Sequence, residues 1–160
     1  MDYYDKIIGE RELFFNRLLI GTDIIPSTQI LEYVPSKSGG RRGYPTIGGT
    51  RIRMRKYPTT VGEYVDNLPI QKIPPEIESK MIDLLNKIHQ LGILHGDAHS
   101  YNFVLDTTGD VRLIDLGESY LFSEINNEVL VKLSEFWQTP IKSLTEAIEF
   151  ENIMHRMDYK

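Results

Sequence analysis

An apolar stripe of helical length that leads directly into a polar loop constrains the fold of this chain most. Between residues 75 and 91 the stripe consists of Ile77, Met81, Leu84, Ile88 and Leu91. Pro75 suits the first turn of such a helix, and Gly92 suits its end. The segment HGDAHSYN follows at residues 95–102. It is therefore predicted to lie in a loop that leaves a buried helix.

Two short strands are predicted directly after this loop. FVLD and VRLID flank the turn TTG, which indicates a hairpin. This hairpin would carry Asn102 at its start and Asp115 at its end, so that an amide and a carboxylate lie side by side. Asp97 stands next to them on the loop. Further downstream, residues 129–137 and 141–154 are predicted to be helical, with Thr139-Pro140 capping the second helix.

The N-terminal part of the chain predicts a helix followed by two strands. Residues 3–19 place Ile7, Leu13, Phe14 and Leu18 near helical spacing, so a helix with this apolar face that ends before Gly21 is predicted. TQILEYV at 28–34 and RIRMRKY at 51–57 are typical of antiparallel strands, joined by a long glycine-rich loop. Together with the downstream helices, this order predicts an α+β fold.

Composition restricts the class of protein. The chain of 160 residues has no cysteine, which excludes disulfides and thiolate chemistry and fits an intracellular, cytoplasmic protein. Its start is charged, and no apolar run approaches the length of a membrane span. The net charge of −5 argues against general nucleic-acid binding. Residues 37–56 carry seven Lys or Arg and no acidic residue, so an anion or nucleic-acid surface there is a weaker alternative.

Three interpretations compete for the HGDAHSYN loop. His95 and His99 are four residues apart, but Gly96 favours a loop over the helix that a two-histidine zinc site would need. A polar turn with one satisfied core histidine is the plainest alternative. The spacing of Asp97, Asn102 and Asp115 favours phosphoryl transfer: Asn102 and Asp115 offer oxygen ligands to Mg²⁺, and Asp97 can orient a hydroxyl and accept its proton.

The same residues resemble the motifs of the protein-kinase-like superfamily. His95-Gly96-Asp97 with Asn102 is similar to its catalytic loop, and Asp115-Leu116-Gly117 to its metal-binding DFG motif. The resemblance covers roughly residues 5–122. It implies a reduced kinase-like fold, with a rudimentary N-lobe at 1–57 and a shortened C-lobe at 58–160. It also implies ATP and Mg²⁺ as cofactors, a structural role for His95, and Val104 beneath the adenine.

The chain departs from the family pattern before its first helix. Only nine residues precede Glu10, which is too short for the usual three strands. We expect Glu10 to be the helix glutamate of the family, with Glu12 as its rival. Lys6 is expected to lie too close to Glu10 in sequence to occupy a separate strand. The phosphate-pairing lysine is therefore predicted to be missing.

A substitute cation is conceivable in the basic segment. Arg51, Arg53 and Arg55 would share one face of an edge strand, and Arg41 and Arg42 lie in the preceding loop. Protection of an exposed sheet edge by these charges is the favoured interpretation, since it needs no exact geometry.

The expected function is an ATP- and Mg²⁺-dependent phosphotransferase, in particular a minimal atypical serine/threonine protein kinase with a protein substrate. One alternative is a catalytically impaired kinase mimic that binds a partner kinase or signalling protein. The other is a small-molecule phosphotransferase, because the loop pattern H-G-D-x-H-x-x-N is similar to that of aminoglycoside phosphotransferases.

Overall fold

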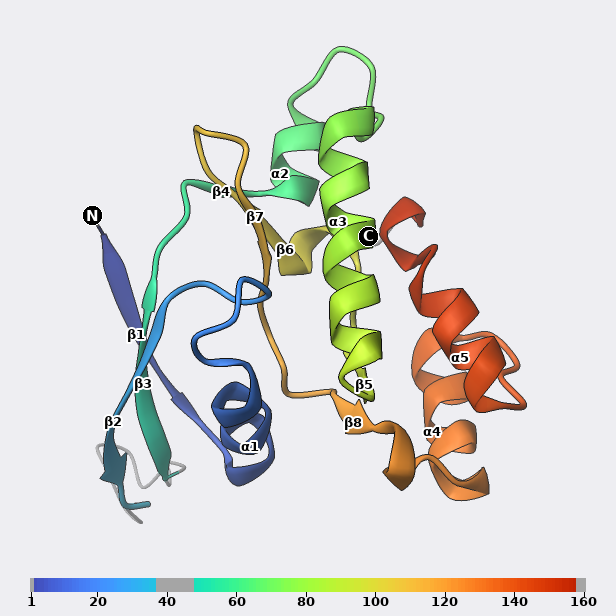
Figure 1. Cartoon of the computed structure of the whole chain (residues 1–160), viewed down its shortest axis with the longest axis horizontal. Helices are drawn as coiled ribbons and strands as arrows, with labels where there is room; N and C mark the ends of the chain where they lie inside the picture. The colour runs from blue at the N-terminus through green and yellow to red at the C-terminus, as the bar shows by residue number, and fades with distance from the viewer. Residues whose placement is uncertain (1, 37–47, 158–160) are drawn as a thin grey trace, which may run out of the picture.

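The computed structural model describes residues 2–36 and 48–157, which form a mixed α+β structure (Figure 1). The strands are β1 (Tyr3–Ile8), β2 (Thr28–Val34), β3 (Gly49–Arg55), β4 (Thr59–Thr60), β5 (Ile93–Leu94), β6 (Phe103–Leu105), β7 (Val111–Leu113) and β8 (Tyr120–Leu121). The helices are α1 (Glu10–Leu19), α2 (Val61–Asp66), α3 (Pro75–Gln90), α4 (Asn127–Trp137) and α5 (Leu144–Glu151). Short 3₁₀ turns occupy Ser100–Asn102, Phe122–Glu124 and Met154–Arg156.

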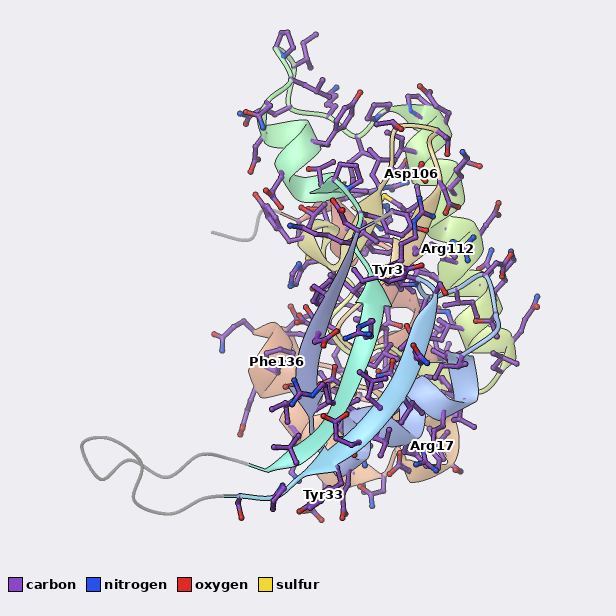
Figure 2. All side chains as sticks on the ribbon, turned by 90° about the vertical axis from the view of Figure 1, so that its left-hand side faces the viewer. Tyr3, Arg17, Tyr33, Asp106, Arg112 and Phe136 are labelled. Atoms are coloured by element: carbon purple, nitrogen blue, oxygen red, sulfur yellow. The ribbon has the colours of Figure 1, made fainter. Side chains whose placement is uncertain are left out.

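The N-terminal strands form one antiparallel sheet in the order β1-β3-β2. Figure 2 looks onto its outer face, with β3 between the other two strands. Strict alternation along β3 buries Ile52 and Met54 on the inner face, where they meet Ile8. Helix α1 covers this inner face, so the sheet and the helix share a small apolar core (Figure 1).

Two sequence expectations fail in this part. Residues 3–8 were expected to begin a helix, but they form β1, which pairs with β3 from Tyr3↔Arg55 to Ile8↔Thr50. The run YYDKII is rich in aromatic and β-branched residues, so an available strand partner decides its conformation. As a result β3 is the central strand of the sheet, and its arginines do not protect an edge.

Helix α1 also presents a different face to the core than expected. Phe15 and Leu19 are buried, whereas Phe14 and Leu18 are exposed. The helix begins only at Glu10, and its buried side must face both the sheet and the larger core. Leu13 is partly buried against the sheet core, as expected.

The larger core lies around α3, which runs through the middle of the molecule (Figure 1). Its predicted stripe is buried from Ile77 to Ile88, but Leu91 at its end is 55% exposed. Strands β6 and β7 form the predicted hairpin, in a sheet of order β4-β6-β7. The backbone N–H of Ile114 donates to the carbonyl of Asn102 at 2.9 Å, so the pairing extends to the residue before Asp115.

The C-terminal helices α4 and α5 complete this core. Trp137 and Leu133 are buried on α4, as expected, but Phe136 on the same helix is exposed. The cap of α5 is Ser143, whose side chain accepts from the backbone of Glu146, and not the Thr139-Pro140 pair. Within the described ranges, no helix combines the length and the apolar content needed to cross a bilayer.

The observed face of α1 gives a direct test of this packing. Phe15→Ala should lower the free energy of unfolding by about 3–5 kcal/mol, because the ring is 1% exposed. Phe14→Ala, on a ring that is 47% exposed, should change it by no more than about 1 kcal/mol. Urea denaturation of both variants measures the difference. Equal losses would contradict the orientation of the helix.

Candidate active site

His95 joins the HGDAHSYN loop to the segment that carries Asp115. Its side chain is fully buried. Nδ1 accepts a hydrogen bond from the backbone N–H of Asp97 at 3.1 Å, and Nε2 lies 2.8 Å from the carbonyl of Ile114. Because an N–H only donates and a carbonyl only accepts, the ring is neutral and carries its proton on Nε2. Both ring nitrogens are therefore used in holding the loop, which leaves no lone pair for zinc.

The structure brings Asp97 and Asn102 into direct contact. The Asn102 amide nitrogen donates to the Asp97 carbonyl at 2.8 Å and to its carboxylate Oδ2 at 3.2 Å. The other carboxylate oxygen lies 3.4 Å from Nε2 of His99. Since the amide nitrogen is turned toward Asp97, the amide oxygen of Asn102 is the atom that can serve as a metal ligand.

Lys6 connects three elements at the centre of the site. Its Nζ lies 2.7 Å from Oε2 of Glu12 on α1 and 3.0 Å from Oδ1 of Asp115. The expectation for Lys6 was wrong, because the lysine does lie on a separate strand, β1. The chain reverses at Gly9, so α1 runs back past β1 and brings Glu12 opposite Lys6.

The partner of this lysine is Glu12 and not Glu10, which corrects the first choice made from sequence. Side chains two positions apart on a helix point in directions about 200° apart, so only one of the two can face β1. Glu10 instead lines a surface hollow with Arg11 and Phe14.

Two properties of this cluster are unusual: the pKa of Lys6 and the backbone conformation of Asp115. Burial alone would lower the pKa of Lys6, but its hydrogen bonds with Glu12 and Asp115 outweigh burial and raise it above its ordinary value. Asp115 adopts a left-handed backbone with φ of 61°. For a residue other than glycine this conformation costs about 1–3 kcal/mol, and such strain tends to occur at functional sites. The Asp115 carboxylate is 52% exposed, so it remains open to a ligand.

The arginines of β3 do not take the place of this lysine. Each one lies within ion-pair distance of a carboxylate elsewhere: Arg51 with Glu32, Arg53 with Asp5, and Arg55 with Asp106. Arg41, Arg42 and most of the predicted glycine-rich loop fall outside the described residues.

A cavity of about 400 Å³ lies between the sheet and the β6–β7 hairpin. It is lined by Tyr4, Pro26, Met54, Arg55, Lys56, Tyr57, Val104 and Ile114. Val104 lines it from the hairpin, and Met54 lines it from β3. Burial and a 2.6 Å hydrogen bond to Asp110 raise the pKa of Tyr57 to about 12, so its hydroxyl stays protonated. The volume lies within the range of small-ligand sites.

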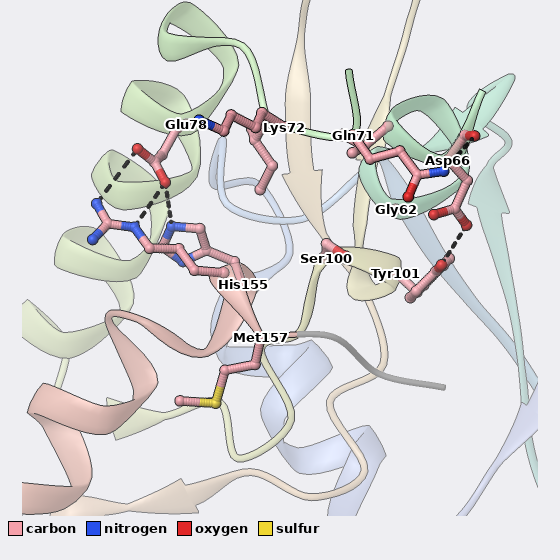
Figure 3. A pocket seen from close by; sticks show the side chains of 12 residues that line it. Gly62, Asp66, Gln71, Lys72, Glu78, Ser100, Tyr101, His155 and Met157 are labelled. Atoms are coloured by element: carbon pink, nitrogen blue, oxygen red, sulfur yellow. Dashed lines mark hydrogen bonds and ion pairs between the residues drawn. The ribbon is translucent and has the colours of Figure 1, made fainter. Parts of the chain in front are cut away.

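A second cavity, of about 460 Å³, opens beside the loop (Figure 3). Helix α2 supplies one wall, where the Tyr101 hydroxyl donates to Asp66. On the opposite wall Glu78 accepts from His155 Nε2 at 3.0 Å and from Arg156 Nε at 2.9 Å. The Arg156 contact lowers the pKa of Glu78, while burial lowers that of His155. The cavity is thus polar, and Glu78 offsets the charge of Arg156 within it.

Glu151 anchors the start of the loop, and it was not identified from sequence. Its carboxylate is fully buried and accepts the backbone N–H groups of His95 at 2.9 Å and Gly96 at 2.7 Å. It also lies 2.8 Å from Nε2 of His89. From α4, Trp137 donates to the Gly96 carbonyl at 2.8 Å. A glutamate four residues after Ala147, on the apolar face of a helix, is the sequence signal that could have revealed it.

Asn102 and Asp115 fit a magnesium ion by chemistry. Both offer oxygen, and Mg²⁺ usually takes only one or two protein ligands, the remainder being phosphate oxygens and water. Among the described residues, no group of three or more His, Cys, Asp or Glu side chains could hold a metal ion. These two side chains would therefore bind the ion together with a nucleotide.

Comparison with known proteins identifies related sequences. Residues 51–134, more than half of the chain, match the sequence model of the family described as lipopolysaccharide core biosynthesis protein (WaaY). A stretch of 57 residues is 35% identical to the lipopolysaccharide core heptose(II) kinase WaaY of Escherichia coli K12, and covers 34% of this chain and 24% of that protein.

Two further relatives match over shorter shares of their length. A stretch of 40 residues, 25% of this chain, is 45% identical to the probable serine/threonine-protein kinase ndrC of Dictyostelium discoideum, and covers 3% of it. Another of 60 residues, 36% of this chain, is 37% identical to a probable bifunctional tRNA threonylcarbamoyladenosine biosynthesis protein of Methanosarcina barkeri, and covers 11% of it. The chain thus spans less than a quarter of each relative's length.

The position after His95, Gly96, has no room for a side chain. Its φ is +90°, and an added Cβ would lie 2.0 Å from the carbonyl oxygen of Glu118. Gly92 has a similar φ of +76°, but an added Cβ there meets nothing within 4 Å. Gly92→Ala should lower the free energy of unfolding by about 1–2 kcal/mol from backbone strain alone. Gly96→Ala should cost about 1–3 kcal/mol more, measured by urea denaturation. Equal costs would contradict the close approach of the two backbones.

Proposed function

The chain belongs to the WaaY family of lipopolysaccharide core biosynthesis proteins, within the protein-kinase-like superfamily, and on this premise we propose that it transfers the γ-phosphoryl group of ATP to an alcohol. The observation that carries the proposal is the contact of Lys6 with both Glu12 and Asp115. A nucleotide phosphotransferase needs a fixed cation for the phosphates beside a carboxylate for the metal, and this cluster supplies both.

Each side chain of the site has a place in this reaction. Glu12 holds Lys6 so that its ammonium would face the phosphates, and Asp115 and the amide oxygen of Asn102 would hold Mg²⁺. The metal, when bound, offsets negative charge on the phosphates. Asp97 orients the acceptor hydroxyl and accepts its proton. As the acceptor oxygen bonds to the γ-phosphorus, the bond to the β-phosphate oxygen breaks and ADP leaves.

The cavity between the sheet and the β6–β7 hairpin is the proposed adenine site. In this proposal Val104, which the resemblance puts beneath the adenine, contacts one face of the base, and Met54 contacts the other. The chain from Arg55 to Tyr57 joins the sheet to the helical part and lines the rim. Residues 1–57 and 58–160 then act as two lobes with the nucleotide between them.

The polar cavity of Figure 3 favours a small acceptor that carries several hydroxyl groups. Ser100 and Tyr101 line it, and both lie on the loop between Asp97 and Asn102. Acidic and basic side chains both line it, which suits a ligand that is recognised mainly by hydrogen bonds. The E. coli relative is named as a heptose kinase, which agrees with a sugar acceptor. A serine or threonine of a protein is the competing acceptor.

The kinase-mimic alternative receives less support. Lys6, paired with Glu12 and Asp115, is a candidate for the lysine that was expected to be missing. The strand expected at the edge, β3, lies between β1 and β2, so pairing with a partner's strand would have to use β1 or β2 instead.

Turnover of single-residue variants tests the proposal. Wild-type protein should transfer ³²P from γ-labelled ATP to at least one member of a panel of heptoses, hexoses and serine/threonine peptides. Lys6→Met should lower the rate by about 10²–10³, by analogy with the loss of one preorganised donor to a developing charge. Lys87→Met removes a lysine that pairs with Asp23 away from the site, and it should retain the wild-type rate. A fully active Lys6→Met protein would contradict the proposal.

A further inference from the structure

Arg11 follows Glu10 on α1 and directly precedes the glutamate that holds Lys6. Its guanidinium bonds to Glu124 in a fork: Nη1 lies 3.1 Å from Oε2 and Nη2 lies 2.9 Å from Oε1. Nη2 also donates to the carbonyl of Ser119 at 2.9 Å. One side chain of α1 therefore contacts both ends of the segment Ser119–Glu124, which follows the Asp115-Leu116-Gly117 motif.

These contacts form a network and not a single surface ion pair. The guanidinium lies over the ring of Tyr120, 4.8 Å from its centroid. Glu124 is itself fixed, because Oε1 accepts the backbone N–H of Leu121 at 2.8 Å. Hydrogen bonding to Glu124 raises the pKa of Arg11, and the same contact lowers that of Glu124. A forked arginine pair within a network is worth more than an isolated exposed pair.

The segment that Arg11 contacts is attached to the catalytic loop. Ser119 Oγ donates to the carbonyl of His95 at 2.9 Å, and both groups are buried. Strand β8 pairs with β5, the two residues before His95, through Leu94↔Tyr120 and Ile93↔Leu121. Arg11 is thus connected to the loop that carries Asp97 through Ser119 and this strand pair.

We propose that Arg11 is a positioning residue that fixes α1 against Ser119–Glu124 and so keeps Glu12 in contact with Lys6. Neighbouring side chains on a helix diverge by about 100°, which lets Arg11 face this segment while Glu12 faces β1. A shift or rotation of α1 that breaks one contact therefore disturbs the other. This role rests on the proposed function for its effect on catalysis, but the geometry of Lys6 is independent of activity.

The expected effect falls on nucleotide binding more than on the chemical step. Without Arg11, α1 spends part of its time with Glu12 away from Lys6, and only the paired fraction is ready for the phosphates. The apparent affinity falls in proportion to that fraction. We expect Arg11→Met to raise the KM for Mg·ATP about fivefold, while kcat stays within about twofold.

Arg53 provides a matched control on the same sheet-and-helix unit. Its guanidinium also forms a fork, with Nε 2.8 Å and Nη2 3.0 Å from the carboxylate of Asp5, but it joins two strands of the sheet and leaves α1 untouched. Arg53→Met should keep the wild-type KM. The reversed pair R11E/E124R should bring KM back toward wild type from the higher values of R11E and E124R alone. A general loss of stability would not show this recovery.

The reactivity of the Lys6 amine gives a measurement that needs no catalysis. Brief acetylation, followed by peptide mass spectrometry, should modify Lys6 several-fold faster in Arg11→Met than in wild type or Arg53→Met, with melting temperatures measured alongside. If the wild-type protein is inactive but Lys6 is still acetylated faster in Arg11→Met, the proposed function fails and the positioning role stands. Equal labelling of Lys6 in the Arg11 and Arg53 variants, or no recovery in the reversed pair, would overturn the inference.

Discussion

The contact of Lys6 with Glu12 and Asp115 is the interaction on which the arrangement of this protein depends. It joins β1 and α1, which are neighbours in sequence, to the end of the β6–β7 hairpin, which lies about a hundred residues further along the chain. The three side chains are partly exposed, so each pair is worth only about 1 kcal/mol to stability. Their value lies in geometry: they define where the phosphates and the metal of a nucleotide would lie.

Around this point the structure separates two cavities. One lies between the sheet and the hairpin and has apolar walls from Met54 and Val104, which suit a flat base. The other lies between α2, the HGDAHSYN loop and the Met154–Arg156 turn, and most of the residues that line it are polar. Asp97 and Asn102 belong to the loop that contributes walls to the second cavity, while Val104 follows on the same chain and faces the first. In the proposed reaction the first cavity would hold the nucleotide and the second the acceptor.

The sequence predicted those parts of the structure that depend on local pattern. The α3 stripe, the polar loop and the β6–β7 hairpin are encoded within about 40 contiguous residues, so periodicity and turn residues were sufficient. The helix prediction for the YYDKII segment was wrong because the conformation of this segment is decided by pairing with β3, more than 40 residues away. Which of Glu10 and Glu12 faces β1 depends on the rotation of α1 about its axis. This rotation changes with the residue at which the helix begins. Glu151 was missed because two of its partners are the backbone N–H groups of His95 and Gly96, and its side-chain partner His89 is 62 residues away in sequence.

Calorimetric titration of ATP, with and without Mg²⁺, tests the central claim most directly, because it asks whether the Lys6 cluster forms a nucleotide site. The account predicts binding that depends on Mg²⁺, is lost in Asp115→Ala, and persists in a variant at Asp23, a carboxylate that pairs with Lys87 outside the site. Binding of equal strength in Asp115→Ala, or no binding by the folded wild-type protein, would contradict it.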